Sequence, residues 1–219
     1  MKISCIIPAY NEEKTIAGVV EAVKGSNLFD EIIVISDGST DMTPYILKRT
    51  HGIHFIDLEQ NHGKGGAVWK GLGKASGEII VMLDADLIGV SKDNLEKLIN
   101  PLKNEGIHVC IGTIQHEKKS WMSFIQRTGS NLSGQQAFFK YLVEDANIRD
   151  SRFGLEMALK NHFKKKNARV KKVILPGISH LMKEQKMGFS DGLKHRGKMY
   201  GEVGREIGNN IKDKLKNVK

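Results

Sequence analysis

The sequence has few cysteines and no long apolar segment. It contains two cysteines in 219 residues, and no apolar run approaches the length of a membrane-spanning helix, which needs roughly 20 residues. Residues 1–8 have only a short apolar stretch without a small-residue cleavage site, so we interpret them as a first strand rather than a signal peptide. Cys5 and Cys110 both lie in strand-like runs, which favours buried thiols in a reducing cytoplasm. The absence of G-x-x-x-x-G-K-[ST] excludes a P-loop ATPase.

Positive charge is unevenly distributed along the chain. The net charge is +9, but residues 1–159 carry 17 basic and 20 acidic side chains, a balance of −3. Residues 160–219 carry 17 basic and 5 acidic side chains, a balance of +12. This basic last quarter is either an ordinary solvated surface or a contact for an anionic partner. Such a partner would be a phosphorylated acceptor, the inner membrane leaflet or nucleic acid.

The first half of the chain alternates between strand-like and helix-like patterns. Strands are expected at Ile3–Ile7, Glu31–Ser36, Ile53–Leu58, Glu78–Leu83 and Val109–Thr113. Helices are expected between them, at Glu13–Lys24, from Asp41, at Gly66–Ala75 and at Ser91–Lys103. Strands separated by single helices predict an α/β fold with a mostly parallel, Rossmann-like sheet flanked by helices. In such a sheet, ligands bind beyond the carboxyl ends of the strands.

The second half is less regular. Short helices are expected at Trp121–Thr128 and Gln135–Val143, a longer helix at Leu155–Asn167 and a strand at Val170–Leu175. From Gly188 onward the sequence predicts a long amphipathic helix, because apolar residues recur at helical spacing. This stripe consists of Leu193, Tyr200, Val203, Ile207, Ile211 and Leu215.

Glycines also recur along this predicted C-terminal helix. Each of them costs a helix about 1 kcal/mol relative to alanine. Something is therefore expected to approach that face closely, either a partner helix in a homodimer or the body of the protein. The alternative is that the helix breaks there. The glycines are Gly197, Gly201, Gly204 and Gly208.

Two aspartates directly follow the apolar run Ile79–Leu83. Asp84 and Asp86 stand at i and i+2 of an extended segment, so their carboxylates point to the same side. Because the carboxylates repel one another, a hard divalent cation is their natural occupant, with substrate phosphates completing its shell. The pattern predicts an enzyme that holds a diphosphate through Mg²⁺ or Mn²⁺. His180, beyond the strand Val170–Leu175, is either a further ligand that favours Mn²⁺ or a structural histidine.

Other strand ends also carry polar groups. Asn11 and Glu12 suit a ribose hydroxyl or an anion, although an ordinary helix cap also explains them. Asp37 could accept from the imide N–H of a uracil or cap the next helix. Lys64 stands between two glycines, where its ammonium and the neighbouring backbone N–H groups could meet a phosphate. A flexible loop with a solvated lysine is the alternative.

In combination these segments resemble glycosyltransferase family 2, whose members have the GT-A fold. The resemblance covers roughly residues 1–115, and the G-K-G loop narrows it to dolichyl-phosphate glucosyltransferases and glucosyl-3-phosphoglycerate synthases. Two features depart from the family pattern, since Ser36 replaces an acidic residue and Phe153 replaces a glycine. The matching segments, in order, are Pro8-Ala9-Tyr10-Asn11-Glu12-Glu13, Asp37-Gly38-Ser39-Thr40-Asp41, Asn61-His62-Gly63-Lys64-Gly65-Gly66-Ala67 and Gly77-Glu78-Ile79-Ile80-Val81-Met82-Leu83-Asp84-Ala85-Asp86-Leu87.

The resemblance implies roles for individual residues. Asp86 and His180, together with Asp84, would bind the metal. The acceptor loop of the family falls at Ser133, Gly134 and Gln135. Donor-nucleotide binding would involve Pro8, Ala9, Tyr10, Glu12, Asp37, Lys64 and Asp84.

The catalytic carboxylate is less well defined by the sequence. Glu156 falls where the family places a proposed catalytic carboxylate, and Asp145 is a second candidate. A carboxylate near the sugar could act as general base or stabilise an oxocarbenium-like state. A first-turn glutamate that complements a helix dipole is the structural alternative. Because Glu144 and Asp150 lie close by as well, the sequence leaves open both the catalytic residue and the choice between inversion and retention.

We therefore expect a metal-dependent glycosyltransferase that uses Mn²⁺ or Mg²⁺. It would move a sugar, glucose in the first instance, from a UDP-linked donor to a phosphorylated or lipid-phosphate acceptor. Residues 1–115 would bind the donor, residues 116–187 would form the acceptor-side and catalytic half of the same domain, and residues 188–219 would form a basic helical tail. We expect a cytoplasmic protein that contacts the anionic inner membrane surface peripherally.

Two other functions remain as alternatives. A sugar-phosphate nucleotidyltransferase would need a G-x-G-x-x-x-x-x-x-P-K segment near the N-terminus, and residues 8–18 do not supply it. A module that binds an anionic membrane or nucleic acid through the basic tail would bind without metal and with strong salt dependence. Few aromatic residues stand among the basic ones, so nucleic acid is not an expected partner.

Overall fold

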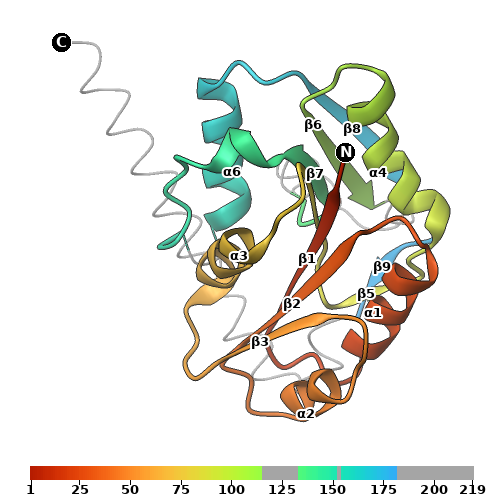
Figure 1. Ribbon diagram of the computed structural model, residues 1–219, viewed down its shortest axis with the longest axis vertical. Coiled ribbons are helices and arrows are strands. Elements are labelled where there is room, and N and C mark those ends of the chain that lie inside the picture. Colours follow the sequence, from red (N-terminus) through yellow and green to blue (C-terminus); the bar gives the residue numbers. More distant parts are fainter. Residues whose placement is uncertain (115–132, 152–153, 182–219) are drawn as a thin grey trace, which may run out of the picture.

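The computed structural model describes residues 1–114, 133–151 and 154–181 (Figure 1). Strands and helices alternate through most of this part of the chain. In order they are β1 (Ile3–Ala9), α1 (Ile16–Gly25), β2 (Glu31–Asp37), α2 (Thr43–Lys48), β3 (His54–Leu58), α3 (Gly63–Lys74), β4 (Ile79–Met82), β5 (Leu87–Ile88), α4 (Lys92–Asn104), β6 (Val109–Ile114), β7 (Gln136–Phe139), the 3-10 helix η1 (Lys140–Val143), α6 (Leu155–Lys165), β8 (Val170–Leu175) and β9 (Ser179–His180).

Seven strands form one sheet in the order β3-β2-β1-β4-β7-β6-β8. All neighbouring pairs are parallel except those that involve β7, which runs antiparallel to β4 and to β6. The remaining two strands, β5 and β9, form a separate antiparallel pair. The mostly parallel α/β sheet predicted from the sequence is therefore confirmed. No helix in the described ranges is long and apolar enough to cross a membrane.

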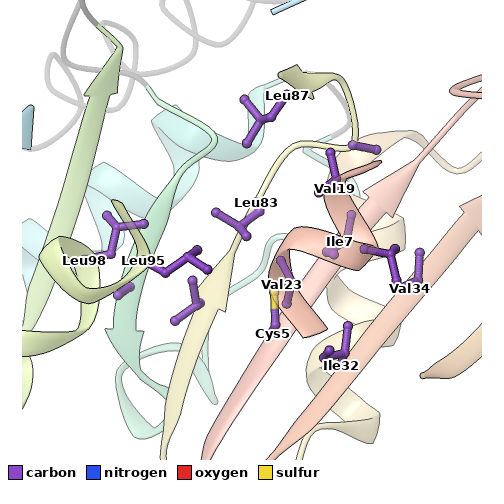
Figure 2. Packing of buried hydrophobic residues seen from close by; sticks show 14 of the residues in the cluster. Cys5, Ile7, Val19, Val23, Ile32, Val34, Leu83, Leu87, Leu95 and Leu98 are labelled. Atoms are coloured by element: carbon purple, nitrogen blue, oxygen red, sulfur yellow. The ribbon is translucent and has the colours of Figure 1, made fainter. Parts of the chain in front are cut away.

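Helices cover both faces of the sheet, as Figure 1 shows, and each face has its own core. On one face, Val19 and Val23 of α1 and Leu95 and Leu98 of α4 pack on the strands (Figure 2). On the other face, α3 and α6 pack on side chains such as Ile6. Because successive side chains of a strand point to opposite faces, β1 is buried along its whole length. This explains why its sequence is an apolar run rather than an alternating one.

One secondary-structure prediction is wrong. The segment Gln135–Val143 is a strand followed by a 3-10 helix, not a single helix. The strand β7 lies between β4 and β6, where both of its neighbours bond to its backbone and Ala137 and Phe138 are fully buried. A short apolar run fits a helix or a strand equally well, and strand pairing decides the outcome here. The predictions for Trp121–Thr128 and for the tail from Gly188 onward lie outside the described residues.

The sheet brings distant segments to one edge. The parallel strands β1, β2 and β4 all end at this edge, and the antiparallel β7 begins there. The segment just before β7 therefore meets the residues that follow β4. The small β5–β9 sheet brings β9, near the end of the described chain, to the same place. In this sheet Leu87, directly after Asp86, pairs with His180. Strands from before and after residue 115 share this one sheet.

Candidate active site

The two aspartates and the histidine predicted to bind a metal lie together. Asp84 and Asp86 follow β4, and His180 is the last residue of β9. Nδ1 of His180 is 2.9 Å from Oδ1 of Asp86, and the backbone N–H of Leu181 donates to the carbonyl of Asp86 at 3.1 Å. One ligand atom from each of the three side chains lies within 4.8 Å of the other two. The structure thus joins residues that are 94 positions apart.

A glycine allows the β5–β9 pairing that delivers His180. Gly89, directly after β5, has a φ of +80°, which L side chains rarely adopt. A Cβ built on Gly89 would collide with the carbonyl oxygen of Gly177, just before β9. The close approach of these two backbones therefore depends on the missing side chain. The position of His180 is therefore linked to Gly89, which is not itself one of the three candidate ligands.

The electrostatics of the cluster favour a charged histidine when no cation is bound. Burial alone lowers the pKa of His180, but the hydrogen bond to Asp86 and the negative charges of Asp86 and Asp84 outweigh it. The net effect raises the pKa of His180 above its ordinary value. The carboxylates of Asp86 and Asp84 thus favour the protonated form of His180.

Lys64 connects the metal candidates to Glu156. Lys64 lies in the first turn of α3, and its Nζ is 2.5 Å from Oδ1 of Asp84 and 2.5 Å from Oε1 of Glu156. The side chains of Lys64 and Glu156 are only 20% and 16% exposed. Burial lowers the pKa of Lys64, but the two carboxylates raise it by more, so the net pKa lies well above its usual value. The lysine is therefore a charged bridge between the D-x-D segment and α6, rather than a solvated loop residue.

The predicted acceptor segment lies against Asp84. Gln135 donates a hydrogen bond from Nε2 to Oδ2 of Asp84 at 2.8 Å, and Gly134 packs directly on the same carboxylate. Sequence reasoning missed this contact. The two segments are separated by about fifty residues, and no sequence motif links them. The contact follows from the antiparallel pairing of β7 with β4, in which Gln136 stands opposite Met82.

The predicted nucleoside residues line the same edge of the sheet. Pro8 and Ala9 are buried in β1, while Tyr10 directly after the strand is 38% exposed. Glu12 accepts a hydrogen bond from Oγ1 of Thr15 at 3.1 Å. Asp37 at the end of β2 is buried, and its Oδ1 accepts from the backbone N–H of His62 at 2.9 Å. Asp37 thus fixes the loop that carries Lys64, a role that neither sequence interpretation included.

The loops after β1 and β2 are tied together by side chains. Asn11 adopts a φ of 56°, and its Oδ1 accepts from the backbone N–H of Thr40 at 2.8 Å. Its own N–H donates to Oγ of Ser39 at 3.1 Å. In the same way, the backbone N–H of Glu13 donates to the carboxylate of Asp41 at 3.1 Å, and the carboxylate of Glu13 accepts from the backbone N–H of Met42 at 3.0 Å. These reciprocal bonds shape the rim next to Tyr10 and account for the asparagine and acidic residues in both motifs.

Asp145 lies apart from this cluster. Its carboxylate is 61% exposed and pairs with Lys166 at 2.7 Å and with His162 at 3.3 Å. The hydrogen bond from Lys166 lowers the pKa of Asp145 below its usual value. These partners stand at the end of α6, whereas Glu156 stands at its start, beside Lys64. Of the two predicted catalytic carboxylates, the structure brings only Glu156 to the site.

The donor set at this edge fits a divalent cation. Two carboxylates and one imidazole converge, all partly buried, and such ligands suit Mn²⁺ and, through the oxygens, Mg²⁺. The neighbouring ammonium of Lys64 and the start of α3 provide positive charge for the anionic part of a ligand. The site can therefore hold a cation and a diphosphate side by side.

Comparison with known proteins assigns the family. The model of the family described as "Glycosyl transferase family 2" matches residues 4–173. The chain belongs to glycosyl transferase family 2. The family resemblance expected from the sequence is thus confirmed, and its match extends beyond residue 115 to β8.

Curated members of glycosyl transferase family 2 are similar over different lengths. Glucosyl-3-phosphoglycerate synthase of Mycolicibacterium smegmatis is 36% identical over 120 residues, half of this chain and 39% of that protein. UDP-N-acetylglucosamine–dolichyl-phosphate N-acetylglucosaminyltransferase of Methanococcus voltae is 32% identical over 179 residues, 73% of this chain and 70% of that protein. The matched region thus spans well under half of the M. smegmatis synthase and most of the M. voltae relative.

Solved structures of a family member share the fold. Glucosyl-3-phosphoglycerate synthase of Mycobacterium tuberculosis, in complex with Mn²⁺, UDP and phosphoglyceric acid, aligns with a TM-score of 0.65 and 26% identity over 82% of this chain and 70% of that chain. The same enzyme with Mn²⁺, UDP-glucose and glycerol 3-phosphate aligns with a TM-score of 0.70 and 25% identity, covering 92% and 77%. The GT-A fold expected from the resemblance is confirmed by this likeness.

Proposed function

We propose that this protein is a metal-dependent glycosyltransferase that moves a hexose from a UDP-linked donor to a phosphorylated acceptor. Glucose is the hexose that we propose first. The observation that carries the proposal is the convergence of Asp84, Asp86, His180 and Lys64 at the carboxyl end of β4. Two carboxylates and an imidazole that could bind a cation, and one ammonium that could bind a phosphate, lie close together. This arrangement suits a nucleotide diphosphate better than a single phosphate or a neutral sugar.

The comparisons support the choice of UDP and of the metal. The M. tuberculosis enzyme of similar fold was solved with Mn²⁺ or Mg²⁺ together with UDP, and with UDP-glucose. The M. voltae relative is named for a UDP-N-acetylglucosamine donor. The ligands of the solved complexes and the name of the M. voltae relative share the uridine diphosphate and differ in the sugar. UDP is therefore the donor nucleotide in this proposal, and N-acetylglucosamine is the sugar to compare with glucose.

Each residue at the edge of the sheet has a role in this proposal. Asp86 and His180, with Asp84, would hold Mn²⁺ or Mg²⁺, and Lys64 would contact the diphosphate. A bound cation offsets the charge that develops on the leaving diphosphate. Pro8, Ala9, Tyr10, Glu12 and Asp37 would surround the nucleoside.

Lys64 and Glu156 would act together. In the absence of ligand, the ammonium of Lys64 is shared between the carboxylates of Asp84 and Glu156. A diphosphate that draws the ammonium toward itself leaves Glu156 with less compensation and more basic character. Glu156 could then accept a proton from an acceptor hydroxyl or stabilise positive charge on the sugar. Ser133, Gly134 and Gln135 would border the acceptor.

The acceptor is proposed to carry a phosphate. The similar proteins point to two kinds, since one group is named for phosphoglycerate and the M. voltae relative for dolichyl phosphate. The +12 balance of residues 160–219 suits either a soluble phosphorylated compound or a polyprenyl phosphate at an anionic membrane surface. A peripheral protein at the cytoplasmic side of the membrane is consistent with the second kind. The homodimer expected through the C-terminal helix concerns residues outside the described part of the chain.

Release of UDP from UDP-sugars tests the proposal directly. The protein is incubated with Mn²⁺ or Mg²⁺, UDP-glucose or UDP-N-acetylglucosamine, and either phosphoglycerate or a polyprenyl phosphate in vesicles. We expect acceptor-dependent release of UDP, and loss of metal-dependent UDP binding in Asp86→Ala. In a parallel assay with UTP and a sugar 1-phosphate in place of the UDP-sugar, formation of UDP-sugar with release of pyrophosphate would identify a nucleotidyltransferase instead. UDP affinity in Mn²⁺ that is unchanged by Asp86→Ala would refute the proposed site.

A further inference from the structure

Asp84 is held by two different donors, one on each carboxylate oxygen. Lys64 contacts Oδ1, and the amide of Gln135 donates from Nε2 to Oδ2 at 2.8 Å. A carboxylate bound on both oxygens cannot rotate freely about its terminal bond. Gln135 itself is 1% exposed, so its amide is fixed by the protein rather than by solvent. The rotamer of Asp84 is therefore set by a residue outside the D-x-D segment.

The orientation of the Gln135 amide is determined by its other partner. Oγ of Ser133 lies 2.7 Å from Oε1 of Gln135 and donates to it, while the backbone N–H of Gln135 donates back to the same Oγ at 3.2 Å. The amide oxygen is thus occupied by a hydroxyl, and the amide nitrogen faces Asp84. Since a carboxylate only accepts hydrogen bonds, the opposite orientation of the amide would leave two acceptors in contact.

Gly134 provides the space that this arrangement needs. A Cβ built on Gly134 would collide with both carboxylate oxygens of Asp84. The backbone of the segment before β7 therefore packs directly on the carboxylate, and any side chain there would displace it. The β4–β7 ladder holds the two strands in a fixed register, with Gln136 opposite Met82. A backbone shift that relieved such a collision would disturb this ladder.

We propose that Gln135 is a positioning residue of the donor site and acts on metal and diphosphate binding through Asp84. Gly134, which has no side chain, leaves the space that the Asp84 carboxylate requires. The inference rests on the proposed function, because it gives Asp84 a part in binding the cation. The segment 133–135, which was expected to border the acceptor, thereby also positions Asp84, a proposed metal ligand on the donor side. Loss of a hydrogen bond that orients a metal ligand typically weakens metal binding by roughly 10- to 100-fold.

A pair of adjacent glutamines gives a matched test. Gln135→Met keeps the length and volume of the side chain but removes the N–H that reaches Asp84. The control is Gln136→Met at the next residue, which is also buried but donates to the carbonyl of Ser133 instead. Oε1 of Gln136 has no partner among the described residues, so of the side-chain bonds shown the substitution removes the one to Ser133 and leaves the contacts of Asp84 in place. By calorimetric titration of UDP in saturating Mn²⁺, we expect Kd to rise about tenfold for Gln135→Met and less than about twofold for Gln136→Met.

A double-mutant cycle separates positioning from a general structural effect. If Gln135 acts through Asp84, Gln135→Met should change Kd by less than about twofold in an Asp84→Ala background. A tenfold effect that persists in that background would overturn the proposal, and so would equal effects of the two methionine substitutions. Should Gln135→Met not fold, Ser133→Ala is the second variant. It removes the hydroxyl that donates to Oε1 of Gln135, so that the orientation of the amide is no longer fixed. We then expect about threefold weaker binding, again only when Asp84 is present.

Titration with Mn²⁺ alone distinguishes this proposal from the proposed function. The bound cation is followed by electron paramagnetic resonance, without nucleotide, in the same four proteins of the cycle. If the wild-type protein binds Mn²⁺ but not UDP, the proposed function fails while the coupling between Gln135 and Asp84 is still measured. If the wild-type protein does not bind Mn²⁺ either, both proposals are overturned.

Discussion

Lys64 and Glu156 are 92 positions apart in the sequence, yet Nζ of the lysine lies 2.5 Å from Oε1 of the glutamate. The same ammonium also contacts Asp84. The ammonium group of Lys64 therefore connects the start of α3, the D-x-D segment and the start of α6. Lys64 therefore links Asp84, which belongs to a family motif, to Glu156, whose catalytic role the sequence left open. The pairing identifies Glu156, among the neighbouring carboxylates, as the one in contact with the proposed donor site.

Glu156 and Asp145 make a matched pair for testing the catalytic role. We expect Glu156→Gln to lower the rate of sugar transfer by about 10²- to 10⁴-fold, the usual range for removal of a general base. Asp145→Asn should leave the rate within about twofold, since its carboxylate is exposed and bonds to Lys166 at the other end of α6. The rates are measured as UDP release in the presence of acceptor. Equal losses in the two variants would contradict the assignment.

His180 should determine the choice of metal. Without its imidazole, His180→Ala leaves only the two carboxylates of the cluster, whose oxygens bind Mg²⁺ and Mn²⁺ alike. We expect Mn²⁺ binding to weaken by at least about tenfold and the preference for Mn²⁺ over Mg²⁺ to shrink. Calorimetric titration with each metal measures both effects. His51→Ala, at an exposed turn after α2, is the control and should bind both metals like the wild type.

Gly89 should matter for metal binding although it does not touch the metal candidates. Gly89→Ala places a side chain at a φ of +80° and against the carbonyl of Gly177, so the β5–β9 pair must shift and take His180 with it. We expect weaker Mn²⁺ binding and a lower melting temperature. Gly18→Ala is the matched control, because a Cβ there meets nothing within 4 Å. That variant should raise stability by up to about 1 kcal/mol, since alanine favours a helix interior. Unchanged Mn²⁺ binding in Gly89→Ala would show that β5 does not position His180.

Glu31 should make stability depend on pH in the acid range. Its carboxylate accepts hydrogen bonds from Oγ of Ser4, from the N–H and Oγ of Ser76 and from Gly77 N–H. Burial raises its pKa, but these donors outweigh that effect and lower the pKa to about 2. A lowered folded-state pKa stabilises the protein above the unfolded-state pKa of about 4.5, and the contribution is lost as the pH falls toward 2.

The Glu31→Gln variant measures this contribution. We expect a loss of free energy of unfolding on the order of 2 kcal/mol at pH 7, discounted for partial exposure. The difference from the wild type should shrink as the pH falls from about 5 toward 2, which urea unfolding at several pH values would measure. UDP binding at pH 7 should not change, because Glu31 stands at the start of β2 and the candidate site at the strand ends. A difference that does not vary with pH would contradict the assigned cause.

The local sequence determined much of the fold. The buried strands β1, β2 and β4 are apolar runs with polar turns at both ends, and the helices between them have periodic apolar faces. These signals are local, so the α/β sheet and its ligand-binding edge follow from them. The same holds for Asp84 and Asp86, whose spacing alone places both carboxylates on one side of the chain. His180 was a candidate ligand from its place after a predicted strand, and the family resemblance assigned it to the metal. Local pattern gave no reason to join it to Asp86.

Only the tertiary structure decided how distant segments meet. The sequence of β7 fits a helix as well as a strand, and its place between β4 and β6 depends on pairing with residues far along the chain. That placement sets Gln135 and Gly134 against Asp84, and the packing of α6 near α3 brings Glu156 rather than Asp145 to Lys64. Hydrogen bonds and ion pairs act over a few ångströms, so contacts between residues 50 to 94 positions apart depend on the folded sheet. The sequence by itself specified the chemical groups of the site, and the fold selected which of them act on one another.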